Sequence, residues 1–345
     1  MNKQKKYLFI LIVGVVIACI IGVMVGPVFI HPLVVLKIWI HKISCGLFFQ
    51  SADWNSIAET IVLDIRTPRV ILAMLVGMGL AISGTAMQGL FRNPMAEPYV
   101  LGMSAGAATG ATLAMVLGIG TVFGGLTIPA MAFLGATATI FVVYNIARTE
   151  GRIPTETLLL SGIAVGFFLY AVVSFLKLIA SEHTLRDIVL WLMGSFASGS
   201  WQDVKIVALP ILCGIFTLYL FSRELNVIAF GEEQALHLGV EVERCKRILL
   251  IASSLITAVS VAVSGIIGFV GLVIPHITRL IVGPNHYILL PASALGGAIF
   301  LVLADILART VTQPMEIPIG IITAAIGAPY FVYLLRRRKK TVNWW

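Results

Sequence analysis

Charged residues are scarce in this chain, where Asp, Glu, Lys and Arg make up only 12% of 345 residues. A soluble domain typically carries about 25% charged residues, so an ordinary soluble enzyme or binding module is excluded. Hydrophobic residues account for 59%, and the mean hydropathy is +1.00. The composition therefore predicts an all-α polytopic membrane protein, because helices satisfy their own backbone hydrogen bonds in lipid.

Cysteine clusters and nucleotide-binding motifs are also missing. The four cysteines, Cys19, Cys45, Cys213 and Cys245, are scattered, with no C-x-x-C pair and no metal-ligand spacing. We expect them to be small apolar fillers. No G-x-x-x-x-G-K-[ST] phosphate loop occurs, so the chain does not bind ATP by that route. We expect no catalytic residue, metal or cofactor, and any ATP hydrolysis should belong to a separate partner.

Apolar runs recur along the whole chain and predict about ten membrane spans. The first run is long enough to cross a bilayer and has no small-residue cleavage pattern after it, so we expect an uncleaved helix rather than a signal peptide. No stretch between the runs is long enough for a soluble domain, which makes residues 1–345 a single membrane domain. The predicted spans cover residues 7–29, 68–90, 97–117, 122–147, 155–180, 204–222, 247–267, 269–282, 288–307 and 318–335.

The net charge of +8 reflects membrane orientation rather than nucleic-acid binding. With the N-terminus inside, 16 of the 24 lysines and arginines fall on the cytoplasmic side of the predicted spans. Cytoplasmic loops carry this excess of Lys and Arg in membrane proteins generally. An even number of spans with both termini in the cytoplasm therefore fits the distribution.

The run from Gly265 to Arg279 contains residues that a plain lipid-facing helix does not need. Glycines, Pro275, His276 and Arg279 interrupt an apolar sequence. Backbone freed from helical hydrogen bonds is tolerated at membrane depth only where protein or a cavity surrounds it. We expect His276 to be structural, with its imidazole satisfying a freed carbonyl at the start of a short broken helix.

Residues 231–240 predict a short helix within the polar stretch 223–246. Its acidic start suits a helix N-terminus, and Gly239 suits a C-cap. Ala235 and Leu238 are expected on one face. Two alternatives stay open, a solvated loop or a docking helix whose apolar side chains enter a partner's groove.

Polar residues also gather near the ends of several predicted spans. Asn93 and Pro94 form a turn in which Asn93 could cap the next helix. Arg66, Arg69 and Arg309 lie at the predicted outer ends. They could anchor the interface, form local ion pairs with neighbouring carboxylates, or receive an acidic partner.

These residues together resemble the FecCD family of ABC importer permeases for iron–siderophore, haem and vitamin B12. The matching motifs run in order from Arg66 to Phe331. They are Arg66-x-Pro68-Arg69, Ser83-Gly84-x-x-x-Gln88, Arg92-Asn-Pro-Met-Ala-Glu-Pro98, Leu101-Gly102, Gly106-Ala107, Gly231-x-x-x-Ala235-x-x-Leu238-Gly239, Gly268-Phe-Val-Gly-Leu-Val-Ile-Pro275-His276-x-x-Arg279, Ala304-Asp305-x-x-Ala-Arg309, Glu316-x-Pro-x-Gly320 and Ile326-Gly-Ala-Pro329-x-Phe331.

The resemblance implies a type II ABC importer permease of about ten spans in a prokaryotic inner or plasma membrane. It would act as a homodimer with two copies of an ATPase subunit and an extracytoplasmic binding protein. In this scheme Arg66, Arg69 and Arg309 would dock the binding protein. The 223–246 stretch would couple to the ATPase through Gly231, Glu232, Ala235, Leu238 and Gly239.

The remaining signature positions are assigned by the same resemblance. Thr155, Glu156 and Ser161 would form the cytoplasmic gate or path, although a carboxylate at Glu156 departs from the small hydroxylated residues expected there. Asn93, Pro94, Pro275, His276 and Arg279 would be structural.

Two questions stay open at the level of sequence. An ion-coupled secondary transporter that works without an ATPase would use Asp305, Glu316 or His276 for the coupling ion. The cargo of an importer could be an iron–siderophore, haem or cobalamin, or alternatively an oxyanion such as molybdate.

Overall fold

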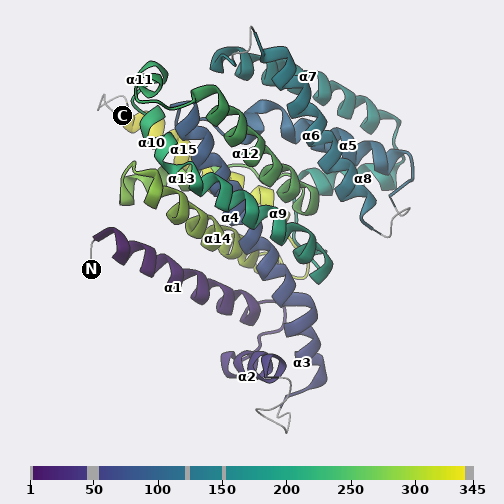
Figure 1. The fold of residues 1–345 in the computed structure, drawn as a ribbon. Helices are drawn as coiled ribbons and strands as arrows, with labels where there is room; N and C mark the ends of the chain where they lie inside the picture. Colours follow the sequence, from purple (N-terminus) through teal and green to yellow (C-terminus); the bar gives the residue numbers. More distant parts are fainter. Residues whose placement is uncertain (1–2, 45–53, 121–124, 150–152, 339–345) are drawn as a thin grey trace.

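The computed structural model describes residues 3–44, 54–120, 125–149 and 153–338, whose regular elements are all helical. Figure 1 shows them in chain order. They are α1 (Lys3–Met24), α2 (Pro32–Ile43), α3 (Ser56–Thr60), the π-helical η1 (Ile61–Arg66), α4 (Thr67–Leu90), the 3₁₀ turn η2 (Pro98–Leu101), α5 (Met103–Val116), α6 (Thr127–Ala147), α7 (Thr155–Ile179), α8 (Glu182–Leu192), α9 (Trp201–Leu220), α10 (Ser222–Ile228), α11 (Glu232–His237), α12 (Val242–Ser264), α13 (Val270–Val282), α14 (His286–Thr310) and α15 (Ile319–Arg338).

Ten of these helices correspond to the ten predicted spans. Seven stretches are long and apolar enough to cross a bilayer, namely α1, the continuous α3–η1–α4 helix, α6, α7, α9, α12 and α14. Three shorter apolar helices, α5, α13 and α15, complete the set. The third predicted span, 97–117, is not one helix, because left-handed Gly102 (φ 77°) separates η2 from α5.

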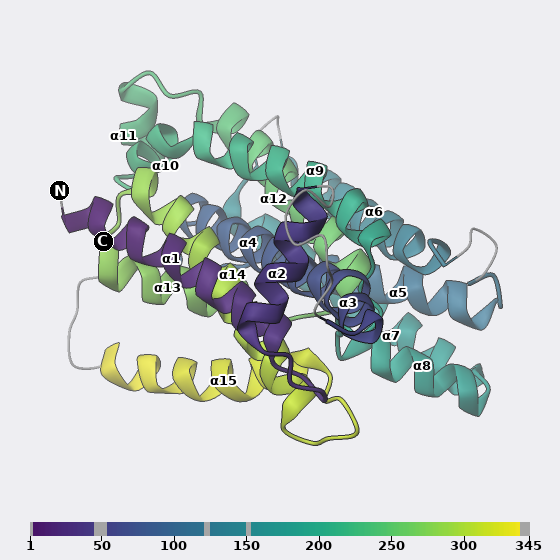
Figure 2. The same ribbon diagram turned by 90° about the horizontal axis from the view of Figure 1, so that it is seen from below.

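The helix that ends in α4 runs through the centre of the bundle. In its most apolar window 83% of the residues are buried, against 17% for α1 and 22% for α7. α14, α12, α13 and α9 pack around it (Figures 1 and 2). Gly77 faces Gly297 of α14 and Gly84 faces Gly271 of α13, so closely that a Cβ at either position would overlap the opposing backbone. Small residues therefore let these helices touch along their main chains.

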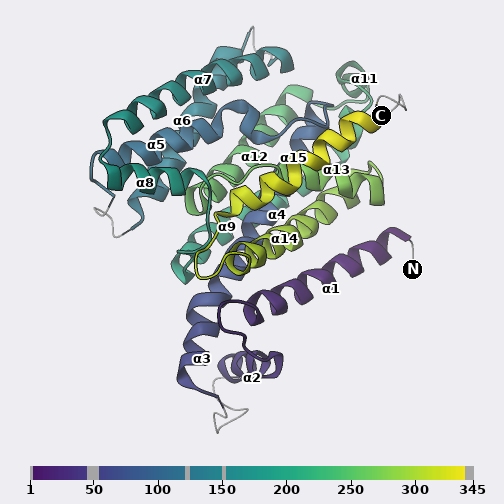
Figure 3. The ribbon, with the colours of Figure 1, turned by 180° about the vertical axis from the view of Figure 1, so that it is seen from behind.

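The two ends of the bundle differ. Both termini lie at the same end as α10 and α11, whereas α2, α3 and α8 lie at the opposite end (Figures 1 and 2). Figure 3 shows α15 on the face opposite α9 and α12. α2, α3 and α8 were not predicted, and they fall in the stretches 30–67 and 181–203 between predicted spans.

A π-helical insertion marks where the central helix leaves the bundle. In η1 the amide of Thr67 donates to the carbonyl of Val62, five residues earlier. A π segment leaves carbonyls without the usual helical partner. The indole of Trp201, at the start of α9, donates to the carbonyl of Leu63 at 2.9 Å. Neighbouring helices thus satisfy the irregular backbone.

Candidate functional site

The predicted short helix in the 223–246 stretch is present as α11. Gly231 precedes it with φ 129°, and Gly239 follows it with φ 79°. The amide of Val240 donates to the carbonyl of Ala235, and that of Gly239 donates to Leu236. These two bonds form a Schellman motif, which requires the left-handed glycine. The sequence therefore fixes both ends of a helix only six residues long.

The expected common face of Ala235 and Leu238 was wrong. Ala235 is 0% exposed and packs inside the subunit against Ile228 and Val242. Leu238 is 68% exposed, and Leu236 is 59% exposed. The exposed apolar side chains of α11 and its C-cap are therefore Leu236 and Leu238. Ala235 instead packs the helix against its own subunit.

A buried lysine ties α11 to the start of α7. Lys246 of α12 is almost fully buried, and its ammonium lies 2.6 Å from Glu232 of α11 and 3.5 Å from Glu243. The same ammonium donates to the carbonyl of Ile153 at 3.4 Å, and Glu243 accepts from the Ile153 amide at 3.1 Å. Residue 153 is two positions before α7 begins at Thr155. α11 and the start of α7 thus share one ionic cluster, which we call the inner cluster (Glu232, Glu243 and Lys246).

The predicted gate residues lie on different sides of α7. Thr155 and Glu156 begin the helix, and Glu156 is exposed. Ser161 is buried within the subunit, next to Gly162, which packs on Leu101 of η2. The exposed side of α7 carries large apolar residues instead. They include Leu160, Phe167, Phe168, Tyr170 and Phe175.

Three arginines meet two carboxylates at the opposite end of the molecule. The Arg69 guanidinium lies 2.8 Å from Asp305 and 2.9 Å from Glu316, while Arg309 lies 3.4 Å from Asp305. Arg66 donates to the carbonyls of Val23 and Met24, both at 2.9 Å, and Arg309 donates to that of Gly22. We call this group the outer cluster (Arg66, Arg69, Asp305, Arg309 and Glu316). It joins α1, α4, α14 and the segment before α15.

All three arginines of the outer cluster are buried. Local ion pairing, which the sequence analysis left open, is confirmed for Arg69 and Arg309. Direct docking of an acidic partner on Arg66, Arg69 and Arg309 stays a prediction. Such a partner would first have to displace contacts that these groups already make inside the subunit.

The signature turn after α4 is closed by Asn93, although not as predicted. The side-chain oxygen of Asn93 accepts from the backbone amide of Met95 at 2.9 Å, and the backbone carbonyl of Asn93 accepts from the backbone amide of Ala96. Asn93 therefore forms an Asx turn rather than a helix cap, and Glu97 occupies the N-cap position of η2. Pro94 lies within this turn. Glu97 is the first residue of the predicted span 97–117.

The glycine-rich run does break the helix where the sequence indicated. α12 ends at Ser264, left-handed Gly265 follows, and α13 begins only at Val270. The freed carbonyl of Ile267 accepts from the Tyr99 hydroxyl at 3.1 Å. Protein surrounds the irregular backbone, as lipid exclusion requires.

His276 and its neighbours lie within α13. Pro275 is inside the helix rather than at its start, and Arg279 is in its last turn. His276 is buried, and its ring meets that of Tyr330 of α15 edge-on, with 6.5 Å between centroids. The structural role of His276 stays a prediction.

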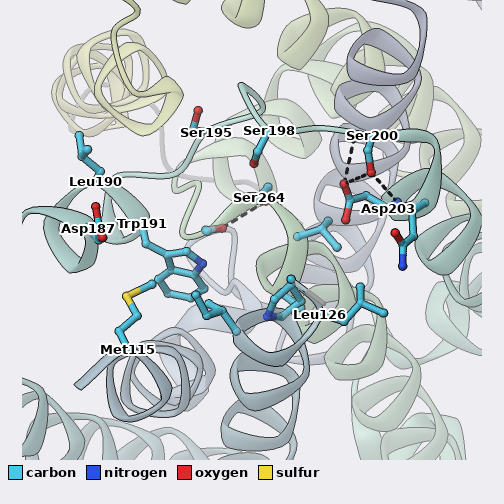
Figure 4. Close-up of a pocket in the computed structure, with 17 residues that line it drawn as sticks. Met115, Leu126, Asp187, Leu190, Trp191, Ser195, Ser198, Ser200, Asp203 and Ser264 are labelled. Carbon is cyan, nitrogen blue, oxygen red and sulfur yellow. Dashed lines mark hydrogen bonds between the residues drawn. The ribbon is translucent and has the colours of Figure 1, made fainter. Parts of the chain in front are cut away.

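A cavity of about 490 Å³ with a mixed polar and apolar lining opens at the end opposite the termini (Figure 4). It lies between the ends of α5, α6, α8, α9 and α12. Hydroxyls of Ser195, Ser198 and Ser264 and the ring of Trp191 line it. Asp203 also lines it but closes a capping box with Ser200. No sequence motif predicted this cavity, because its lining residues come from the ends of helices that are far apart in the chain.

Comparisons with known proteins agree with this arrangement. The chain matches the FecCD transport family over residues 13–337. It is 50% identical to the cobalamin import system permease protein BtuC of Halobacterium salinarum over 82% of this chain and 75% of that protein. It is 42% identical to the hemin transport system permease protein HmuU of Yersinia pestis over 83% and 87% of the two chains.

A third relative and a solved structure cover nearly the whole chain. The vitamin B12 import system permease protein BtuC of Klebsiella pneumoniae is 36% identical over 98% of this chain and 96% of that protein. The solved structure, described as an inward-facing conformation of a metal-chelate type ABC transporter, superposes with a TM-score of 0.84 at 33% identity. That superposition covers 96% of this chain and 99% of the other.

Proposed function

The chain belongs to the FecCD transport family as a multi-pass permease subunit of an ABC importer, and on this premise we propose that it forms, as a homodimer, the path for a cobalamin-type metal chelate. ATP is hydrolysed by a separate subunit, of which we propose two copies per dimer. An extracytoplasmic binding protein delivers the cargo, and both termini lie in the cytoplasm.

The observation that carries the coupling proposal is the inner cluster. An ATPase seated on Leu236 and Leu238 would move α11. Glu232 would pass the movement to Lys246, which bonds to the residue two positions before Thr155. Force at the cytoplasmic surface would thus reach the residues just before α7 through two hydrogen bonds of Lys246.

An ion-coupled secondary transporter is not favoured. Two of its three candidate groups are already engaged in ion pairs, since Asp305 is held by Arg69 and Arg309, and Glu316 by Arg69. A coupling ion that bound Asp305 would first have to displace the two guanidinium groups that already hold this carboxylate inside the subunit.

The proposed path follows the exposed side of α7. Phe167, Phe168 and Tyr170 are large and apolar, yet the subunit leaves them uncovered. A second copy packed nearby would bury part of this surface and leave the rest facing the cargo, which suits a bulky, partly apolar chelate. Thr155 and Glu156 would lie at the cytoplasmic mouth of the path.

The cargo class rests on the relatives. Two of them are named for cobalamin or vitamin B12 and one for hemin. We place cobalamin first because the 50% identical relative carries that name. Haem is the second candidate, and none of these names supports an oxyanion such as molybdate.

Reconstitution in lipid vesicles tests the proposal. Permease, ATPase and binding protein are combined, and uptake of cobalamin and of haem is measured with ATP, without ATP, and with an ion gradient alone. We expect cobalamin uptake that requires ATP and both partners. Uptake driven by the gradient alone would overturn the proposal, and ATP-driven uptake of haem alone would correct the cargo.

The seat of the ATPase is tested with paired variants. Leu236→Gln/Leu238→Gln should weaken ATPase co-purification by at least about tenfold, since each leucine contributes roughly 1.5–3 kcal/mol when buried. Leu33→Gln/Ile43→Gln, a similarly exposed pair on α2 at the opposite end, is the control and should bind normally. Equal binding by both pairs would rule out this seat.

A further inference from the structure

A groove between α6 and α12 lies outside every site described above. Its volume is about 470 Å³, and its walls are mostly apolar, with Phe141 and Tyr144 on α6 and Ile251 and Leu255 on α12. Phe141 and Ile251 are exposed, so the groove opens sideways from the bundle. It lies on the face opposite α15 (Figures 1 and 3).

The groove changes from apolar to basic along its length. On α12, Arg247, Ile251 and Leu255 are spaced four residues apart and share one face. α6 runs in the opposite direction to α12. Phe141 and Tyr144 of α6 line the groove, and Arg148 follows them as the C-cap of this helix. The two arginines therefore lie together at one end of the groove, at the end of the bundle that holds the termini.

These arginines differ from the other clustered cations of the molecule. Arg148 and Arg247 are exposed, and no carboxylate of the described residues lies within 4 Å of either guanidinium. Lys246, the neighbour of Arg247, has two carboxylates. The buried hydroxyl of Ser254, on the groove wall, also has no hydrogen-bond partner among the described residues. Within the described part of the chain, the site thus offers positive charge without a carboxylate to pair with it.

We propose that this groove binds an anionic phospholipid, with its headgroup phosphate on Arg148 and Arg247 and an acyl chain along the apolar walls. Basic pockets between membrane helices on the cytoplasmic side recognise anionic headgroups in this way. Lipid is the occupant that fits, because the groove opens on the side of the spans and its charged end lies at the level where headgroups begin. Guanidinium groups pair with phosphate through two parallel hydrogen bonds.

Native mass spectrometry of the purified permease tests this site, with phosphatidylglycerol and phosphatidylcholine as probes. Wild-type protein should retain phosphatidylglycerol in preference to phosphatidylcholine. Arg148→Gln/Arg247→Gln should lose that preference, with phosphatidylglycerol affinity falling on the order of tenfold. Ile251→Trp, which fills the groove and keeps both charges, should weaken phosphatidylglycerol retention as well.

The control removes equal charge elsewhere at the same end. Arg223→Gln/Arg336→Gln changes two exposed arginines that do not line the groove, and should retain phosphatidylglycerol like wild type. Thermal unfolding of each variant verifies that it is folded.

Four results would overturn the proposal. They are equal retention of the two lipids by wild type, unchanged phosphatidylglycerol affinity in Arg148→Gln/Arg247→Gln, binding of soluble glycerol phosphate as strong as that of the lipid, and a change of oligomeric state confined to the groove variants. The third result would indicate a free-phosphate site, and the fourth an interface between copies of the chain.

Discussion

The outer and inner clusters both place charged groups inside an apolar bundle, but they are built differently. The outer cluster pairs Arg69 and Arg309 with Asp305 and Glu316, while Arg66 donates to backbone carbonyls at the end of α1. The inner cluster sets one lysine against two carboxylates that remain partly exposed. Buried ion pairs are costly to break because they leave an uncompensated charge, whereas partly exposed carboxylates can return to water. The outer cluster therefore suits a permanent connection between helices, which we call a fixed joint. The inner cluster suits a contact that forms and breaks during transport.

Removing the central carboxylate of the outer cluster should have the largest effect. Asp305→Asn leaves Arg69 and Arg309 buried and close together, with Glu316 as the remaining carboxylate for Arg69. We expect a loss of about 3–5 kcal/mol in the free energy of unfolding. Thermal unfolding in detergent measures it, with Asp187→Asn, an exposed aspartate of α8 at the same end, as the control. A transition temperature like that of wild type would refute the fixed-joint interpretation.

Removing the cation of the inner cluster should affect coupling more than stability. Lys246→Met keeps the buried stem and lets Glu232 and Glu243 turn to solvent. We expect ATP hydrolysis by the assembled transporter to persist, while cargo moved per ATP falls on the order of tenfold, within the usual range of coupling energies. Arg244→Met, which removes an exposed cation of α12, is the matched control. Parallel loss of hydrolysis and uptake would show that Lys246 only holds the fold.

Charge reversal at the three outer arginines tests whether the outer cluster also docks the binding protein. Arg66→Glu/Arg69→Glu/Arg309→Glu is expected to reduce capture of the binding protein, as the sequence resemblance predicts. The same changes should disrupt the outer cluster, so unfolding and capture are measured on one preparation. A folded triple variant that captures the binding protein with wild-type efficiency would refute the prediction that these arginines dock it.

The sequence predicted what depends on local pattern and length. Ten apolar runs, the capped helix at 231–240 and the break after Ser264 each follow from spacing and from glycine. α8 was missed because Glu182, Arg186 and Asp187 lower the mean hydropathy of any window that contains them, although Ile188 of this helix is buried. Short amphipathic helices at a membrane surface carry no span-length signal.

The sequence could not predict which side chains meet across the fold. Arg69 and Asp305 are 236 positions apart, so neither pairing nor burial follows from their neighbours in the chain. Ala235 was assigned to the wrong face because a six-residue helix is too short for its apolar pattern to show one side. Its orientation is set by packing against Ile228 and Val242, which lie outside the helix.

The π-helical η1 makes the contact between the central helix and α9 depend on the number of residues in the chain as well as on their identity. A π turn holds about one residue more than an α turn within the same rotation of the helix. Deleting one residue between Ile61 and Arg66 would therefore let an uninterrupted α-helix form without turning α3 about the axis of α4. The carbonyls that the π turn frees would regain helical partners, and the hydrogen bond from Trp201 to the Leu63 carbonyl would be lost. A relative that keeps every signature residue but lacks this one insertion would therefore hold the start of α9 less firmly at the outer surface.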